Sequence, residues 1–312
     1  MNGIAASQSA LHPAGPDAAI IAQLGWILFI GGGLVFIGVM VACALSLRQA
    51  RPVRPKVWIV GAGVLLPLVV LGALLAFGIW RSAELSRPSS QHALKVAVVA
   101  RMWWWEVRYT DPAGGEDIVL ANEIRVPVGQ PAYLGLSSGD VIHSFWVPAL
   151  AGKVDMVPGR LHGMTLQADR AGVYRAQCAE YCGEQHARMA LHVVAQPPEE
   201  FKAWLAAQAR PAREGDAAVI AQGKRAFVNQ RCAACHTIRG VSNGAPAGLA
   251  PDLTHIGSRL YLGAGTLRNQ PGALAAWVAD PHSVKPGVRM PASADMDGAT
   301  LRALAAYLEQ LK

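Results

Sequence analysis

The residues best suited to chemistry lie in one twelve-residue stretch, Cys178-Ala-Glu-Tyr-Cys182-Gly-Glu-Gln-His186-Ala-Arg-Met189. This stretch supplies two thiolates, an imidazole and a thioether. Soft sulfur ligands combined with imidazole favour copper. A mononuclear copper site of this kind needs only one cysteine. The second thiolate therefore indicates that two copper ions are bridged and share an electron.

A pair of copper ions needs a second imidazole from elsewhere in the chain. His143, in the segment Asp140-Val-Ile-His-Ser-Phe-Trp-Val-Pro148, is the best candidate because it lies at the end of an expected strand. Each residue taken singly has a simpler explanation, a structural role for the histidine and a disulfide for Cys178 and Cys182. A copper-delivery or thiol-exchange protein could use the same cysteines, but it would not need Met189.

A second motif, Cys232-Ala-Ala-Cys235-His236, has the spacing by which c-type haem is attached to proteins. The two cysteines would form thioethers with the haem vinyl groups, and His236 would be an axial ligand of the iron. A redox-active cysteine pair or half of a zinc site would not require the histidine. The motif therefore predicts a covalently bound haem c.

The sixth iron ligand is expected to be a methionine, because Met/His ligation raises the potential of an electron-transfer haem. The Met-Pro pair at Met290 resembles the loop of class I cytochromes c, which favours Met290 over Met296. Pro251 resembles the proline of that family whose carbonyl accepts the N–H of the proximal histidine. A haem with two protein ligands leaves no site for oxygen, so this region is expected to relay electrons.

In the same family, the first and last helices of the domain cross. The resemblance implies that Gly223 and Phe227 of the opening helix lie against the closing helix near Tyr307.

The copper motif lies near the end of a region with short alternating apolar runs, separated by Gly, Pro and Asp at intervals of about ten residues. This pattern is typical of an antiparallel sandwich or barrel. The runs cover residues 94–100, 103–109, 118–120, 132–136, 141–147, 163–166, 172–176 and 190–194.

The haem motif lies in a region that reads as helical. Residues 197–215 form a linker that contains an expected short helix at 198–208. Further helices are expected at 216–229, 271–279 and 298–311, the last with its apolar residues on one face.

Two earlier stretches, residues 20–47 and 57–80, contain no charged side chain, and each is long enough to cross a bilayer as a helix. They explain why only 16% of the chain is charged, against about a quarter in soluble domains. A pair of buried core helices is the alternative. Pro67 inside the second stretch suggests a kink.

The loop between the two stretches carries four basic residues and no acid: Arg48, Arg51, Arg54 and Lys56. The tail, residues 1–19, has Asp17 as its one charged side chain. The positive-inside rule therefore places the loop in the cytoplasm and both the tail and the C-terminal region outside. The first stretch lacks the basic flank of a signal peptide and is expected to be retained as an anchor. The formal net charge of +7 includes these four charges, and it does not indicate nucleic-acid binding.

These features together resemble subunit II of the haem–copper cytochrome c oxidases over residues 20–196. The resemblance rests on the helical hairpin, the aromatic run at 103–109, the His143 segment and the Cys-x3-Cys-x3-His-x2-Met loop. It implies a dinuclear CuA centre in an all-β, cupredoxin-like Greek-key sandwich. The implied copper ligands are His143, Cys178, Cys182, His186, Met189 and the backbone carbonyl of Glu180.

The resemblance also implies roles at the edges of the site. The carboxylate of Glu180 would face a Mg²⁺ or Mn²⁺ ion at the boundary with subunit I, and Asp155 matches a segment that faces subunit I. Trp103 would lie near the copper and admit electrons. A place in the core, on the same strand face as Trp105, is the alternative for Trp103.

With the haem region added, the resemblance extends to the caa3 arrangement, in which subunit II carries a C-terminal cytochrome c. The predicted chain is a multidomain membrane protein: an external tail at 1–19, a transmembrane hairpin at 20–80, a CuA cupredoxin domain at 93–196, a linker at 197–215 and an all-α class I cytochrome c domain at 216–312. The metal domains would lie on the periplasmic side of a bacterial inner membrane.

The implied function is the transfer of electrons from a soluble or membrane-bound cytochrome c, through haem c and CuA, to subunit I. The oxygen-reducing site would lie in subunit I, which reduces O₂ to water with proton pumping, and other oxidase subunits are expected partners. A CuA-type nitric oxide reductase could use a similar subunit for electron input. A quinol oxidase subunit would lack the copper ligands, and a purely structural membrane subunit would need neither metal motif.

Overall fold

The computed structural model describes residues 7–48, 52, 54–85, 93–111, 114–213, 215–242 and 248–312. These residues divide into two units. Asp17–Pro88 form one unit, and Met1–Pro16 together with Ser89–Lys312 form the other. Arg51 of the expected cytoplasmic loop and residues 1–6 of the expected tail lie outside the described residues.

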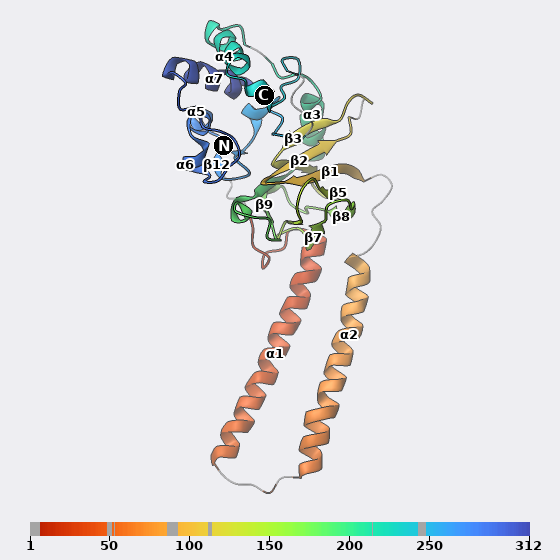
Figure 1. Ribbon diagram of the computed structural model, residues 1–312. Helices are drawn as coiled ribbons and strands as arrows, with labels where there is room; N and C mark the ends of the chain where they lie inside the picture. The colour runs from red at the N-terminus through yellow and green to blue at the C-terminus, as the bar shows by residue number, and fades with distance from the viewer. Residues whose placement is uncertain are drawn as a thin grey trace. The chain divides into compact units, whose positions relative to one another are not determined.

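The first unit is a helical hairpin (Figure 1). Its helices are α1, Pro16–Arg48, and α2, Leu66–Leu85, with α2 preceded by the π-helical segment Val57–Leu65. Both helical stretches are longer than the uncharged runs that predict them. The first starts at Pro16, a residue that fits the first helical turn because its missing N–H would have no partner there. The second continues past residue 80 through Arg81, which donates to Glu84 (2.6 Å) and to Gln23 of α1 (2.7 Å).

The structure has a π-helical segment directly in front of Pro67, and the expected kink there stays a prediction. The N–H of Leu66 donates to the carbonyl of Gly61, five residues earlier. Proline lacks an N–H and crowds the carbonyl four residues before it. A wider turn accommodates that carbonyl without breaking the helix.

Both helical stretches are long and apolar enough to cross a membrane. Their most apolar windows have mean hydropathies of 2.5 and 2.6. Their side chains are mostly exposed, so neither is the buried core helix that the sequence left as an alternative.

The second unit contains a sandwich of two five-stranded sheets. The first sheet has the order β3-β2-β1-β5-β8, formed by Ile118–Ala121, Trp104–Tyr109, Leu94–Arg101, Ala132–Ser138 and His162–Leu166. The second has the order β4-β10-β9-β6-β7, formed by Glu123–Pro127, Ala190–Gln196, Gly172–Cys178, His143–Trp146 and Lys153–Met156. The all-β sandwich is confirmed, but it is not wholly antiparallel, because β1 pairs with β5 and β10 with β4 in parallel.

The sequence pattern does not predict β4 and β7, and the structure places both at the edges of the second sheet. Edge strands commonly carry charged residues, which discourage pairing with other chains. Glu123 and Arg125 on β4, and Lys153 and Asp155 on β7, alternate with apolar residues, but each strand is short and supplies only two such apolar residues, too few to stand out in the sequence.

The core of the sandwich is built from inward-facing residues of both sheets. Trp105 is fully buried and meets Phe145 of the opposite sheet edge-on, with ring centroids 5.6 Å apart. The buried Tyr109 hydroxyl donates to the carbonyl of Arg125 (2.8 Å) and accepts its N–H (2.7 Å). These contacts hold the first sheet against the second, whose strands β6 and β9 carry His143 and Cys178.

The C-terminal helical region follows α3, Pro198–Gln208. It contains α4, Ala218–Asn229, α5, Ala273–Ala279, α6, Pro281–Val284, and α7, Gly298–Gln310, with a two-stranded hairpin of β11, Tyr261–Leu262, and β12, Leu267–Arg268. The bounds of α3 are confirmed. Helix α4 starts two residues later than predicted, and α6 is not predicted because it is a single turn, held by Asp280 as its N-cap.

Helices α4 and α7 cross at Gly223, as expected. A Cβ atom at Gly223 would collide with the carbonyl oxygen of Ala303 and would lie 2.6 Å from Cβ of Tyr307. The rings of Phe227 and Tyr307, both buried, lie 6.5 Å apart beside this crossing. The close approach therefore requires glycine at this position.

Buried polar side chains join the C-terminal helical region to the sandwich. Glu123 of β4 is 2% exposed and accepts the N–H of Leu260 (2.9 Å), with Nη1 of Arg259 at 3.5 Å. The ring of His192 on β10 stacks on Tyr261, with centroids 4.0 Å apart and planes 10° apart. The N–H of Ala190 donates to the carbonyl of Ala264 (3.0 Å).

The crossing of α4 and α7 yields a prediction. Gly223→Ala is expected to lower the free energy of unfolding of the C-terminal helical region by about 2 kcal/mol, because the added methyl overpacks the contact with Ala303. Gln222→Ala, at an exposed position on the same helix, is the control and should change stability by less than about 0.5 kcal/mol. Thermal unfolding of the full chain measures both; equal melting temperatures would contradict the prediction.

Candidate metal centre and haem-binding site

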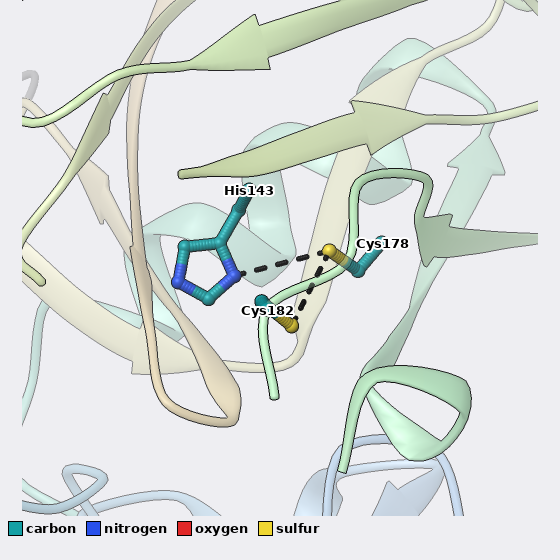
Figure 2. A group of neighbouring side chains, drawn as sticks. All are labelled: His143, Cys178 and Cys182. Carbon is teal, nitrogen blue, oxygen red and sulfur yellow. Dashed lines mark hydrogen bonds between the residues drawn. The ribbon is translucent and has the colours of Figure 1, made fainter. Parts of the chain in front are cut away.

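The two cysteines of the copper motif face one another across the loop formed by residues 178–189, called here the metal loop. Cys178 is the last residue of β9, and Cys182 follows four residues later, after a bend at Glu180. Both are buried, and their Sγ atoms are 3.7 Å apart (Figure 2). A disulfide requires about 2.05 Å, so the thiols are unlinked, and their separation suits sulfurs that share a metal.

His143 enters the site from the neighbouring strand. It opens β6, which pairs with β9 so that Phe145 lies opposite Cys178. Its Nδ1 atom points toward Cys178, 3.8 Å from the Sγ (Figure 2). His143, Cys178 and Cys182 together form a group whose ligand atoms lie within 4.8 Å of one another.

Asp140 fixes the ring of His143. Nε2 of His143 lies 2.8 Å from a carboxylate oxygen of Asp140. The same carboxylate accepts the N–H groups of Met102 (2.6 Å) and Val141 (2.8 Å). Because an ionised carboxylate only accepts, Nε2 carries the proton when the imidazole is neutral, and Nδ1 then has its lone pair toward the sulfurs.

The remaining donors of the copper motif converge on the same two sulfurs. Nδ1 of His186 lies 3.7 Å and Sδ of Met189 lies 3.9 Å from Sγ of Cys182. The carbonyl oxygen of Glu180 lies 3.1 Å from Sγ of Cys178. A short 3-10 turn at His186–Arg188 brings the imidazole back toward the cysteines. Every candidate copper ligand named from the sequence is therefore in one place.

The two thiols behave as one acid pair. A hydrogen bond from Cys182 lowers the pKa of Cys178 far below its ordinary value. The same bond, together with burial, raises the pKa of Cys182. Burial alone would lower the pKa of His143, but its bonds to Cys178 and Asp140 outweigh burial and raise it. The pocket thus holds one thiolate readily, and a cation is needed to hold two.

Trp103 lies against the metal loop. Its Nε1 donates to the carbonyl of Cys182 (2.8 Å). A Cβ atom on Gly183, which has a φ of +111°, would lie 3.1 Å from the indole. Trp103 precedes β2, which begins at Trp104, so it does not share a strand face with Trp105, although its partly buried side chain packs against the core that contains Trp105. Trp105 is the core residue of the pair.

The two carboxylates assigned to the boundary with subunit I are both exposed. Glu180 presents its side chain to solvent from the metal loop, and Asp155 lies on β7 opposite Ser144. The carbonyl of Glu180 and its carboxylate thus face different surroundings, one buried sulfur and one open surface.

The haem motif forms a single turn. Cys232–Ala234 is a 3-10 helix separated from α4 by Gln230 and Arg231, and Cys232 and Cys235 form no disulfide. Nδ1 of His236 donates to the carbonyl of Pro251 (2.7 Å), as the resemblance implied. This bond leaves Nε2 with its lone pair for an iron. Burial lowers the pKa of His236, which keeps the imidazole neutral and able to ligate.

The two candidate sixth ligands both lie in this region. Met290 and Met296 are partly buried and pack against the same apolar cluster, which contains Phe227, Leu304 and Tyr307. The geometry therefore supplies a thioether beside the haem motif but does not by itself choose between the two. The donor set fits a c-type haem: two free thiols, a neutral imidazole and a thioether.

Comparison with known proteins gives matches to both halves of the second unit. The periplasmic domain of cytochrome c oxidase subunit II matches residues 113–196, and the cytochrome c family matches residues 220–312. Cytochrome c oxidase subunit 2 of Alkalihalophilus pseudofirmus is 34% identical over 255 residues, which cover 82% of this chain and 72% of that protein. The chain belongs to the cytochrome c oxidase subunit 2 family.

Other subunit 2 proteins are also similar. The protein of Bacillus subtilis is 32% identical over 231 residues, covering 72% of this chain and 64% of that protein. The solved periplasmic domain of subunit II of the cytochrome oxidase of Bradyrhizobium japonicum is 29% identical and covers 38% of this chain and 95% of that chain, at a TM-score of 0.35.

Family membership confirms the resemblance drawn from the motifs. The chain is a cytochrome c oxidase subunit 2 with a fused cytochrome c domain. It is a membrane protein with an outer domain, because two apolar helices precede the periplasmic domain. Copper follows from the first domain and haem c from the second.

Sequence reasoning missed several residues around the metal loop. Asp140 could have been found, because an acid close to a ligating histidine commonly orients its ring. Gln185 and Lys285 could not have been found in this way. Both are buried, and their contacts lie where the C-terminal helical region packs on the sandwich. A polar side chain of this kind reads as an ordinary surface residue in sequence.

His192 provides a pH-dependent prediction. Burial lowers its pKa to about 4, with Arg175 adding to the effect and Glu123 opposing it. The unfolded chain takes up a proton at His192 below about pH 6.5, whereas the folded chain does not until about pH 4. Stability should therefore fall by about 2–3 kcal/mol as pH drops through this window.

His192→Phe preserves the stacking on Tyr261 and removes the titrating group, whose Nδ1 has no partner in the structure. The variant should lose the acid-dependent part of the fall. Unfolding midpoints measured at pH 7, 5.5 and 4.5 check this, and parallel pH curves for the two proteins would contradict it. His12→Phe, at an exposed position, is the control.

Proposed function

We propose that this chain receives electrons from an external cytochrome c and relays them through its own haem c to a dinuclear CuA centre and on to oxidase subunit I. The observation that carries the proposal is the pair of unlinked thiols 3.7 Å apart with two imidazoles and a thioether around them. A mononuclear copper site would use one thiolate, and a structural site would oxidise the pair to a disulfide.

The ligands proposed for CuA are the side chains of His143, Cys178, Cys182, His186 and Met189 with the carbonyl of Glu180. When bound, two copper ions bridged by two thiolates would share one electron, which reduces rearrangement on redox change. The protein's own contribution is to bury the sulfurs, to orient His143 through Asp140, and to hold the metal loop by backbone hydrogen bonds. The N–H of Cys178 donates to the carbonyl of Met189 (2.9 Å), which closes the loop on itself.

The residues proposed to hold haem c are Cys232, Cys235, His236 and Met290. When bound with two axial ligands, the haem would carry single electrons and offer no site to oxygen. The hydrogen bond from His236 to Pro251 strengthens the imidazole as a donor and fixes its orientation.

We infer that subunit I docks beside the metal loop. Three apolar side chains that neighbour the copper ligands in sequence are exposed, at 37–76% of their surface: Val141, Ile142 and Tyr181. Exposed apolar side chains gathered next to a functional site mark a protein contact. The exposed carboxylate of Glu180 would then be positioned to share a Mg²⁺ or Mn²⁺ ion with subunit I, where oxygen would be reduced to water with proton pumping.

The hairpin would anchor the chain in a bacterial inner membrane, with both metal domains on the periplasmic side. The relatives carry the oxidase name, and the alternative of a CuA-type nitric oxide reductase gains no support from them. Turnover of the complete complex with oxygen and with nitric oxide tests this choice. Consumption of nitric oxide alone would reverse it.

The copper proposal predicts the outcome of one substitution. Cys182→Ser should abolish the mixed-valence electron paramagnetic resonance signal, because one thiolate cannot bridge two copper ions, and it should leave the haem absorption band unchanged. Cys43→Ser, in α1, should retain both signals. A delocalised copper signal surviving in Cys182→Ser would contradict the proposed ligand set.

The haem proposal predicts a difference between two methionines that pack on the same cluster. Met290→Ala should convert the haem from six- to five-coordinate and lower its reduction potential, because a thioether ligand raises the potential. Met296→Ala should leave both unchanged. Optical spectra and redox titration of the two full-length variants measure the effect, and the reverse pattern would assign Met296 as the ligand.

A further inference from the structure

One indole lies between the metal loop and the C-terminal helical region. On its first side, Trp103 donates through Nε1 to the carbonyl of Cys182 (2.8 Å). The ring lies over Gly183, where any side chain would press on it. The indole is therefore bonded directly to the backbone of a proposed copper ligand.

On its other side, Trp103 meets residues 285–289, called here the clamp segment, which ends one residue before Met290. Nζ of Lys285 donates to the carbonyl of Trp103 (3.1 Å). The guanidinium of Arg289 lies over the indole, 5.3 Å from the ring centroid, and also contacts Sδ of Met102 at 3.7 Å. Such a cation over an indole face is attractive.

The clamp segment also contacts the metal loop itself. Nε2 of Gln185, a residue that is 1% exposed, donates to the carbonyl of Pro286. Gly287, with a φ of +81°, lies so close to Glu184 that a Cβ atom would collide with the carboxylate. The clamp segment and the metal loop thus contact one another directly, and both also contact Trp103.

Lys285 is unusual for its place. It is 2% exposed, although a lysine is almost never fully buried without a charged partner. Burial lowers its pKa to about 8, with the nearby Arg188 adding to the effect and Cys182 opposing it. A methionine or leucine would fill the same space at lower cost. The hydrogen bond to the carbonyl of Trp103 is the contact that distinguishes the lysine from them.

We propose that Lys285 is a positioning residue that holds Trp103 against the metal loop, with Arg289 covering the indole, so that electrons pass from the haem site to the copper site by way of this side chain. The inference rests on the proposed relay from haem c to CuA. The transfer moves one electron: the ferrous haem iron becomes ferric, the copper pair is reduced by one electron, and no bond or proton is exchanged.

The test compares three lysine variants of the full chain. Lys285→Met keeps the apolar stem and removes the donor, and Lys285→Arg restores a donor. Lys202→Met removes an exposed lysine of α3 as the control. After rapid photoreduction of the haem, Lys285→Met should slow electron arrival at copper at least about tenfold, because small displacements in a reactive arrangement have large effects on rate. Lys285→Arg should recover part of the loss, and Lys202→Met should show none.

Two further readouts separate positioning from other effects. Both reduction potentials should remain unchanged in Lys285→Met; a slower rate explained by a shifted copper potential would overturn the positioning role. Hydrogen exchange at the Trp103 indole N–H should become faster in Lys285→Met, with or without copper bound. Unchanged exchange would also overturn the proposal.

Arg289→Gln keeps the proposal testable if Lys285→Met fails to assemble. Arg289 is exposed, and its loss uncovers the indole without burying a new group. The variant should slow the transfer and speed the exchange, and wild-type values for both would overturn the clamp. If the wild-type chain itself passes no electron from haem to copper, the proposed function fails. If wild type transfers and every variant matches it, the clamp alone fails.

Discussion

A separation of 3.7 Å between the sulfur atoms of Cys178 and Cys182 places strict demands on the structure around it. In an oxidising compartment, free thiols this close would readily become a disulfide. The end of β9 fixes Cys178. The backbone hydrogen bond from the N–H of Cys178 to the carbonyl of Met189 closes the loop that carries Cys182. The strand pairing of β6 with β9 then adds His143 from a distant part of the chain. The sandwich thus serves to hold the donor atoms together before any metal binds.

The metal motifs and the central elements could be predicted from sequence because their signals are local. The spacing of Cys178, Cys182, His186 and Met189 lies within one loop, and α3 and α7 show clear periodicity or caps. The edge strands β4 and β7 were missed because each is short and has only two apolar side chains in alternation with its charged ones. The π-helical segment was missed because the sequence locates a proline but not the form of its accommodation.

Contacts between the sandwich and the C-terminal helical region could not be predicted, because they join residues far apart in sequence. Glu123 meets Arg259, and His192 meets Tyr261, each pair made of residues usually found on a surface. Their burial is a property of the packed pair of domains and has no local period. Lys285 belongs to the same class, and only its place against Trp103 shows that it differs from an ordinary surface lysine.

The buried pairing of Glu123 with Arg259 also affects how strongly salt weakens the contact between the C-terminal helical region and the sandwich. Ion pairs on a surface weaken as salt rises, whereas a pair shielded from water is screened far less. Because both partners belong to one polypeptide, dilution leaves their effective concentration unchanged. Encounters between separate redox proteins depend on abundance and ionic strength. The contact between Glu123 and Arg259, by contrast, forms within one polypeptide. A change in protein abundance or in ionic strength should therefore leave it largely intact.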